Sequence, residues 1–259
     1  MKEVTFEESR KIQLDILIYF DEYCKTHGLH YSLAGGTLLG AIRHKGFIPW
    51  DDDIDIFMLR KDYDAFLKSY EGKYKLVKNG TPQWFLGYSR LTDENTVIYK
   101  NGKKRFHGIW MAILPVDSFP PKEEWPEFHK RLTKARELCF TKYSHKRKGL
   151  KAWIIRKVLS YKYVAKNLND ELSRYNRTPQ QSLGNIATWH LSTAPDNYPQ
   201  VFDKKCFDDY IKVEFEGREF ESMIGWENYL VSTYGEWQKL PPIEQRVGTH
   251  NYIAYWKDK

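Results

Sequence analysis

The stretch FIPWDDDIDIFM, residues 47–58, places four aspartates within five positions, between a Pro-Trp pair and a hydrophobic run. Carboxylates this close repel one another and are costly to remove from water. If Asp53 begins a strand, Asp53 and Asp55 project from one face, and Asp51 shares their parity. Such oxygen ligands suit Mg²⁺ or Mn²⁺, which also bind phosphates. The stretch therefore predicts a divalent metal site at Asp51, Asp53 and Asp55, with Asp52 fixing the loop; the alternative is a solvated acidic turn.

A second signal lies just upstream, in LAGGTLLG at residues 33–40. It combines the end of a strand, a Gly-Gly turn and the start of a helix. Such a turn lets backbone N–H groups approach a phosphate, and the helix N-terminus favours negative charge. Gly35, Gly36 and Thr37 are therefore expected to bind phosphate, although a tight structural turn is the alternative. The order strand, Gly-Gly-Thr, helix, strand, Asp-x-Asp is the pattern of the nucleotidyltransferase fold.

The remaining patterns predict an α+β protein with a mostly helical, aromatic-rich C-terminal portion. The resemblance of the motif order to the nucleotidyltransferase fold implies a mixed sheet with flanking helices. Helices are expected at 7–25, 37–45, 59–70 and 121–142. Strands are expected at 29–34, 54–59, 74–77, 84–91 and 96–100, and at 108–116, where Pro115 should stop the strand. Residues 211–221 should form a hairpin that turns at Glu216-Gly217.

Composition excludes several classes of protein. Of the 259 residues, 41% are hydrophobic, which is enough for a folded core and too much for a disordered chain. The three cysteines are far apart and show no Cys-x-x-Cys spacing, so a reducing cytoplasm is expected rather than a disulfide framework or a zinc site. The N-terminal MKEVTFEESRK lacks the apolar core of a signal peptide, and no apolar run is long enough to span a membrane.

The positive charge is concentrated in one segment. Nine basic and no acidic residues lie between 138 and 169, so the net charge of +7 becomes 7 − 9 = −2 elsewhere. Trp153, Ile154, Ile155, Val158 and Leu159 are interleaved with these lysines and arginines. Residues 142–166 are therefore expected to contact an anionic membrane. The alternative is a helix packed on the domain with a charged outer face. The predicted division is a catalytic core at 1–137, a basic amphipathic segment at 138–169 and a C-terminal portion at 170–259.

The stretch AGGTLLGAIRHKGFIPWDDDIDIFMLRKDY, residues 34–63, resembles the signature of the LicD family of phosphotransferases, which is related to the fukutin-type transferases. Residues 88–91, 108–117 and 234–250 resemble other parts of that family. The resemblance implies transfer of a phospho-alcohol, such as phosphocholine, glycerol phosphate or ribitol phosphate, from a CDP-linked donor to a sugar hydroxyl. The acceptor would be a cell-surface glycan of the capsule, teichoic acid or lipopolysaccharide type. The resemblance also implies a cytoplasmic enzyme that contacts the inner face of the membrane peripherally.

The resemblance also implies roles for single residues. Asp53 and Asp55 would hold the metal, with Asp51 adding a ligand directly or through water. The turn at 35–37 would cradle the donor phosphates. Charge on the phosphates would be neutralised by Arg43, Lys45 and Arg90, for which a solvated surface position is the alternative. Donor or acceptor would be contacted by Arg246 and His250, unless these cap or pack the structure, and the site wall would be shaped by Pro49 and Trp50.

Position 112 departs from the family pattern. The strand WMAILP carries Ala112 where the family usually has a third aspartate, and alanine can neither bind metal nor accept a proton. The chain is then an engineered inactive form, a natural variant that uses another group, or a degenerate enzyme. Asp117 has the opposite parity in the strand and is expected to have a structural role of its own.

Three other functions compete with phospho-alcohol transfer. A plain nucleotidyltransferase would share the Gly-Gly and Asp-x-Asp elements but release pyrophosphate. A non-catalytic or inactivated nucleotide-binding relative is consistent with Ala112. A nucleic-acid-binding protein is supported by the basic segment alone, and the acidic cluster argues against it, so no nucleic-acid partner is expected.

Overall fold

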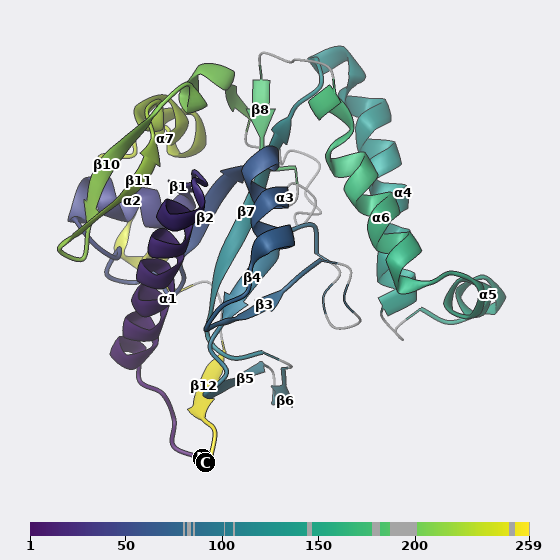
Figure 1. Cartoon of the computed structure of the whole chain (residues 1–259), viewed down its shortest axis with the longest axis horizontal. Helices are drawn as coiled ribbons and strands as arrows, with labels where there is room; N and C mark the ends of the chain where they lie inside the picture. Colours follow the sequence, from purple (N-terminus) through teal and green to yellow (C-terminus); the bar gives the residue numbers. More distant parts are fainter. Residues whose placement is uncertain are drawn as a thin grey trace. The chain divides into compact units, whose positions relative to one another are not determined.

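A computed structural model describes residues 1–79, 81, 84, 86–100, 102–105, 107–143, 147–177, 182–186, 201–248 and 252–258 (Figure 1). The chain forms two compact units. Unit 1 comprises Met1–Leu76, Arg90–Leu114 and Lys205–Lys259, and unit 2 comprises Val77–Ser89 and Pro115–Lys204. The units alternate along the sequence, whereas the division at 1–137, 138–169 and 170–259 is consecutive and remains a prediction.

Unit 1 begins with helix α1, Phe6–His27, whose ends follow from local chemistry. Thr5 and Glu8 form a reciprocal capping box at its start. Gly28, with φ of 62°, ends it in a left-handed conformation that glycine adopts without strain. The helix buries Ile16, Leu17 and Phe20, so the helix expected at 7–25 is confirmed.

The central sheet of unit 1 has the strand order β1-β2-β7-β4-β3. Its strands are β1 Ser32–Leu33, β2 Asp55–Leu59, β7 Trp110–Ser118, β4 Ser89–Thr92 and β3 Lys75–Val77. β1 and β2 are antiparallel, with Leu33 opposite Ile56. Between them lies helix α2, Gly35–His44, and after β2 comes α3, Arg60–Ser69. Phe20 of α1 makes an edge-to-face contact with Phe66 of α3, which ties these two helices together.

The rest of unit 1 comes from distant parts of the chain. A second sheet, ordered β12-β5-β6, joins Ile253–Trp256, Thr96–Lys100 and Lys103–Lys104. The predicted hairpin is confirmed as β10 Tyr210–Phe215 and β11 Arg218–Met223, and Met223 donates its backbone N–H to Ser32 of β1. Helix α7, Trp226–Tyr234, follows, with short 3-10 turns at η3 Lys204–Phe207 and η4 Ile243–Gln245.

Unit 2 is built around two long helices that lie side by side, α4 Trp125–Tyr143 and α6 Tyr161–Leu172 (Figure 1). The shorter α5, Leu150–Val158, connects them, and 3-10 turns lie at η1 Lys122–Glu124 and η2 Arg174–Arg177. Strands β8 Ser182–Gly184 and β9 Val201–Asp203 pair with each other, and β8 also pairs with Asp117 and Ser118, which lie in the part of β7 that belongs to unit 2. The core contains Phe119, Phe128, Leu132, Cys139, Val164, Leu168 and Leu172.

The predicted α+β class with a mixed sheet is confirmed, but two details were wrong. Pro115 does not stop its strand: Asp117 pairs with Gly184 and Ser118 with Leu183, and this pairing keeps the chain extended. A proline lacks only the N–H, and its φ suits a strand where no donor is needed.

The other correction concerns the second half of the chain. The C-terminal portion is not mostly helical, because its described residues contain the five strands β8–β12 and one α-helix. The basic segment, residues 138–169, contains the end of α4, all of α5 and most of α6, and Ser160 caps the start of α6 through the N–H of Tyr163.

Candidate active site

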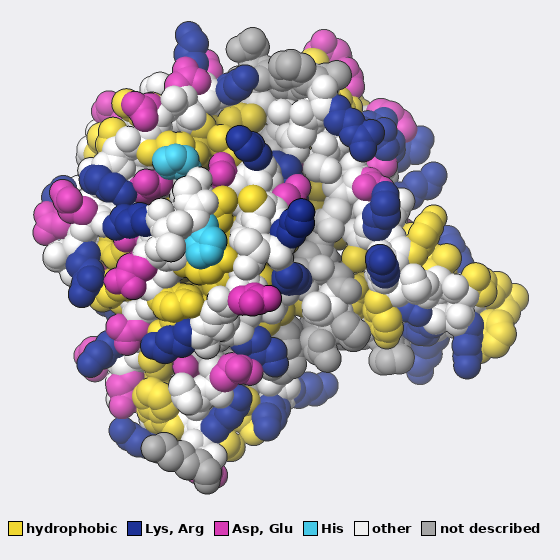
Figure 2. Space-filling view, in the orientation of Figure 1, with side chains coloured by type: hydrophobic (Ala, Val, Ile, Leu, Met, Phe, Trp, Pro, Cys, Tyr) yellow, Lys and Arg dark blue, Asp and Glu magenta, His cyan; other side chains and the backbone are white. Residues whose placement is uncertain are grey.

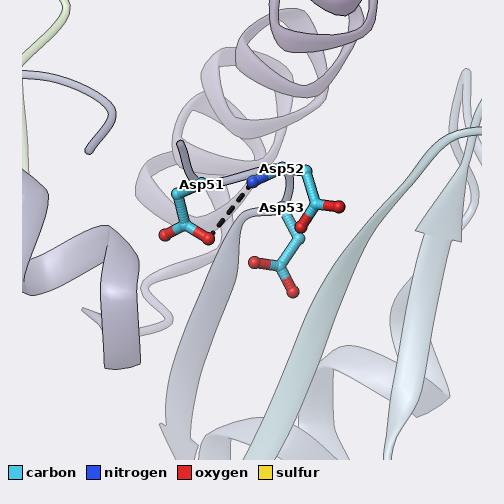
Figure 3. A group of neighbouring side chains, drawn as sticks. All are labelled: Asp51, Asp52 and Asp53. Atoms are coloured by element: carbon cyan, nitrogen blue, oxygen red, sulfur yellow. Dashed lines mark hydrogen bonds between the residues drawn. The ribbon is translucent and has the colours of Figure 1, made fainter. Parts of the chain in front are cut away.

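Three neighbouring carboxylates form a compact group in the loop that leads into β2 (Figure 3). Asp51, Asp52 and Asp53 each contribute an oxygen, and these oxygens lie within 4.8 Å of one another. Asp51 Oδ1 also accepts a hydrogen bond from the N–H of Asp52 at 3.2 Å. The strand begins only at Asp55, so strand alternation does not orient the three residues before it. As a result Asp52, expected to fix the loop, also brings its carboxylate into the group.

The group lies against the Gly-Gly turn that begins α2. A Cβ on Gly36 would stand 2.3 Å from Asp51 Oδ2, so a side chain there would displace the carboxylate. Gly35 has φ of +53°, and a Cβ on it would lie 3.5 Å from Asp55 Oδ2. The turn and the aspartates therefore lie against each other, although a role in binding phosphate or metal remains a prediction. The glycines let the carboxylates approach the positive end of a helix.

Burial and mutual repulsion raise the pKa of these aspartates. Burial, and then the charge of Asp53, raises the pKa of Asp51 to about 7. Burial, with the charges of Asp53 and Asp51, raises the pKa of Asp55 well above its usual range, while Arg90 opposes the rise. Asp55 does not belong to the group whose oxygens lie within 4.8 Å of one another, but the charges of Asp53 and Asp51 act on its carboxylate. A cation between the carboxylates would relieve the repulsion.

Helix α1 and Thr37 hold the aspartate loop in place. Arg10 donates to the carbonyl oxygens of Ile48 and Asp51, at 2.6 and 2.8 Å. Gln13 Nε2 donates to the carbonyl of Asp52 at 2.9 Å. Thr37 Oγ1 accepts from the N–H of Asp55 at 3.0 Å. The hydroxyl of Thr37, predicted to bind phosphate, thus also positions a carboxylate.

Arg90 is a buried cation beside the acidic group. Its guanidinium lies 4.3 Å from the ring centroid of Trp110, and its charge acts on Asp55. His107 is neutral here, because burial lowers its pKa to about 4. Its Nδ1 donates to the carbonyl of Gly108, and Nε2 accepts from Arg90 at 3.4 Å. A buried arginine held this way suits the neutralisation of phosphate predicted for Arg90.

The other predicted cations differ in their surroundings. Arg43 donates to the carbonyls of Trp237 and Lys239. Burial lowers the pKa of Arg43, and the charge of Arg246 lowers it further. Arg246 itself lies 5.5 Å from the ring of Trp50, beside the acidic loop. The side chain of Lys45 is exposed, and its backbone ends α2 with φ of 58°. His250 lies outside the described residues.

Two tyrosines of α7 belong to the site, although their roles were not predicted. Tyr229 Oη accepts from the N–H of Gly35 at 3.2 Å. Burial raises the pKa of Tyr234, and Tyr229 and the charges of Asp55, Asp51 and Asp53 add to the rise. Tyr234 opens the C-terminal stretch that resembles the family, so a signal for it was present. Tyr229 had none, because only the tertiary fold brings α7 to the turn.

Ala112 occupies a buried place next to the acidic group. Its N–H donates to the carbonyl of Ile54, between Asp53 and Asp55, and its side chain is 4% exposed. Asp117 is fully buried in unit 2, where its Oδ1 accepts from Asn176 at 2.6 Å. The structural role expected for Asp117 agrees with this bond.

The donor set fits a hard divalent cation. Carboxylate oxygens grouped within 4.8 Å, at a helix N-terminus with further N–H groups, match the ligands that Mg²⁺ and Mn²⁺ prefer while they bind phosphate. Together with the fold, the site is that of a nucleotidyltransferase-like phosphotransferase.

Comparison with known proteins agrees with this class. Residues 28–154 match the family described as "LicD/FKTN/FKRP, nucleotidyltransferase domain". Over 98% of its length the chain is 32% identical to the lipopolysaccharide cholinephosphotransferase LicD of Haemophilus influenzae, covering 99% of that protein. An uncharacterised protein of Rickettsia prowazekii is 32% identical over 31% of this chain. An uncharacterised protein of Rickettsia typhi is 46% identical over 40% of this chain. The chain therefore belongs to the LicD family of phosphotransferases.

Gly36→Ala is expected to lower activity about 100-fold or more without unfolding the protein. The new methyl group would overlap Asp51 Oδ2 and force that side chain to turn away. The overlap affects one side chain at the first turn of α2, so the protein should remain folded with a similar melting temperature. Kinetics and thermal melts on the same sample separate the two effects. Unchanged activity would show that the position of Asp51 does not matter.

His107→Gln is expected to reduce acid sensitivity between about pH 6.5 and pH 4. The folded state keeps His107 neutral with a pKa of about 4, whereas the unfolded state binds a proton below the ordinary value of 6.5. The native histidine therefore makes the protein lose up to about 3 kcal/mol of stability as the pH falls through this window. Denaturant unfolding of both proteins at several pH values measures the difference. Parallel curves would show that His107 is not held neutral.

Proposed function

We propose that the chain transfers phosphocholine from CDP-choline to a sugar hydroxyl of a lipopolysaccharide or related cell-surface glycan, with Mg²⁺ or Mn²⁺ bound by Asp51, Asp53 and Asp55. The observation that carries the proposal is the carboxylate group packed against the Gly-Gly start of α2. Phosphocholine is chosen because the Haemophilus relative is a cholinephosphotransferase. CDP-glycerol and CDP-ribitol are the alternative donors.

In this reaction the acceptor oxygen forms a bond to the phosphorus next to choline, and the bond from that phosphorus to CMP breaks. A divalent cation, when bound, would polarise the phosphoryl oxygens and offset charge on the leaving CMP. The N-terminus of α2 and the guanidinium of Arg90 add positive charge at the same place. The acceptor hydroxyl must lose its proton, and a carboxylate of this group that does not hold the metal would accept it.

A pocket of about 510 Å³ beside Asp52 supports choline as the head group. Phe6, Trp50 and Tyr252 line it together with the acidic side chains Glu3 and Asp52. Aromatic faces and carboxylates both attract a quaternary ammonium group. Arg10 also lines the pocket and lies over the ring of Phe6, 4.2 Å from its centroid, so Trp50, Tyr252 and the two carboxylates are the groups that would contact choline.

We place the reaction in the cytoplasm, at the inner face of a membrane, because an acceptor of this class is assembled on a lipid. None of the described helices combines the length and the apolar character needed to cross a bilayer. If the described residues contact a membrane, they therefore do so through a surface of the folded chain.

An assay with labelled CDP-choline and purified lipopolysaccharide, with Mg²⁺ or with EDTA, tests the function. The expected result is label in the glycan and one CMP released per transfer, only with the metal. Release of pyrophosphate on incubation with CTP and a phospho-alcohol would instead support a plain nucleotidyltransferase. Nucleotide binding without either product would support a non-catalytic relative.

A further inference from the structure

Helix α5 exposes an apolar face. Leu150 is 74% exposed, Trp153 57%, Ile154 43% and Val158 71%. The spacing i, i+3, i+4 and i+8 places these four side chains on one side of the helix. We call them the α5 face. In Figure 2 hydrophobic side chains gather over α5, with lysine and arginine side chains around them.

The opposite side of α5 is the one that packs on unit 2. Ala152 is buried, and Leu159, just past the end of the helix, packs against the core of α4 and α6. Lys142 of α4 donates to the carbonyl of Arg156 at 2.6 Å, and Arg156 Nε donates to the carbonyl of Thr141. The helix is therefore fixed with its apolar face outward. This arrangement contradicts the alternative of a charged outer face.

The surroundings of the α5 face are strongly basic. Between 147 and 166 the sequence has seven basic residues and no acidic ones. Lys148, Lys151, Lys157 and Lys162 are all exposed. A pocket of about 490 Å³ between α4, α5 and α6 is lined by five basic and two acidic side chains among the described residues. Arg147 pairs with Glu137 at 3.2 Å, so only part of this charge is balanced nearby.

We propose that the α5 face and the lysines around it form a docking surface for a bilayer that contains anionic lipids. The apolar side chains would enter the interfacial region while the lysines meet the lipid phosphates. A second copy of the chain fits this surface less well, because the lysines of both copies would face each other across a two-fold contact. The inference extends the proposed function, since it brings the enzyme to membrane-bound acceptors, but binding needs neither donor nor acceptor.

Co-sedimentation with phosphatidylcholine vesicles, with and without phosphatidylglycerol, tests the docking surface. The wild-type protein should bind the anionic vesicles, and added salt should weaken the binding. Lys151→Glu/Lys157→Glu should weaken it about 25-fold or more, at about fivefold for each charge lost. Lys122→Glu/Lys204→Glu makes the same change in net charge at exposed positions away from α5 and should bind more tightly than that variant.

An apolar pair separates docking from simple attraction of charge. Trp153→Ser/Val158→Ser should weaken binding at least about tenfold, whereas Val231→Ser, on the exposed side of α7, should not. The proposal would be overturned if the wild-type protein bound vesicles with and without phosphatidylglycerol equally well. It would also be overturned if both α5 variants bound the anionic vesicles as tightly as the wild-type protein does. A dimer in solution that dissociates in the Trp153→Ser/Val158→Ser variant would overturn it as well. Transfer to a detergent-dispersed acceptor measures the catalytic function independently and should survive in all four variants.

Discussion

Asp53→Asn is expected to lower phosphocholine transfer at least about 100- to 1,000-fold while the protein stays folded. Asp53 contributes to the carboxylate group within 4.8 Å, and its charge raises the pKa of both Asp51 and Asp55. Asparagine keeps the size of the side chain but removes the charge that holds a divalent cation. Losses of this size are typical when one electrostatic contact to the transition state is removed.

The same variant should have a distinctive effect on stability. Without the charge of Asp53, Asp51 and Asp55 repel less, so the metal-free protein should melt at a higher temperature near neutral pH. The wild-type protein should gain about 2.7 kcal/mol when Mg²⁺ is present at 100 times its dissociation constant, and the variant should gain much less. Thermal melts with Mg²⁺ and with EDTA measure both effects.

Asp15→Asn is the matched control, because Asp15 is an exposed aspartate of α1. It makes the same chemical change away from the site and should preserve both activity and the response to Mg²⁺. If Asp53→Asn retained full activity, or if Mg²⁺ stabilised it as strongly as it does the wild type, Asp53 would not be a metal ligand.

Ala112→Asp is expected to raise the transfer rate about 100-fold or more. Ala112 is buried beside Asp53 and Asp55 through the bond from its N–H to Ile54, at the place where the family resemblance predicts a third carboxylate. A carboxylate there would add a metal ligand or accept the proton of the acceptor hydroxyl, and a well-placed general base contributes about 10²- to 10⁴-fold. Transfer rates at saturating donor and Mg²⁺ measure the gain.

Stability gives Ala112→Asp a second readout. A further buried negative charge should lower the melting temperature in EDTA, and Mg²⁺ should restore it. Ala112→Asn, of the same size but uncharged, should give neither the gain in rate nor the recovery with metal. A fully folded Ala112→Asp protein with no gain would show that another group accepts the proton.

The features that local sequence encodes were predictable. The Gly-Gly turn and the aspartate loop lie close together in sequence, and short-range geometry brings Gly36 to Asp51. The capping box at Thr5 and the left-handed Gly28 likewise fix the ends of α1 from neighbouring residues. Alternation of apolar residues was enough to place β2 and the hairpin of β10 and β11.

The features that depend on long-range contacts were not predictable in the same way. β7 continues past Pro115 because β8, more than sixty residues later, supplies its partner. Tyr229 reaches the turn only because α7 packs there, and Arg10 and Gln13 hold the loop from a helix some forty residues away. The apolar outer face of α5 depends on which side packs on α4. The sequence showed apolar residues interleaved with lysines, but not whether these apolar residues face the protein or the solvent.

Calorimetric titration of CDP-choline, CDP-glycerol and CDP-ribitol, each with Mg²⁺ and with EDTA, tests the central claim most directly. The prediction is that CDP-choline binds the wild-type protein more tightly than the other two do, that binding requires Mg²⁺, and that Asp53→Asn abolishes it. Binding of CDP-choline that is equally strong in EDTA and in the Asp53→Asn variant would contradict a metal-dependent donor site at these aspartates.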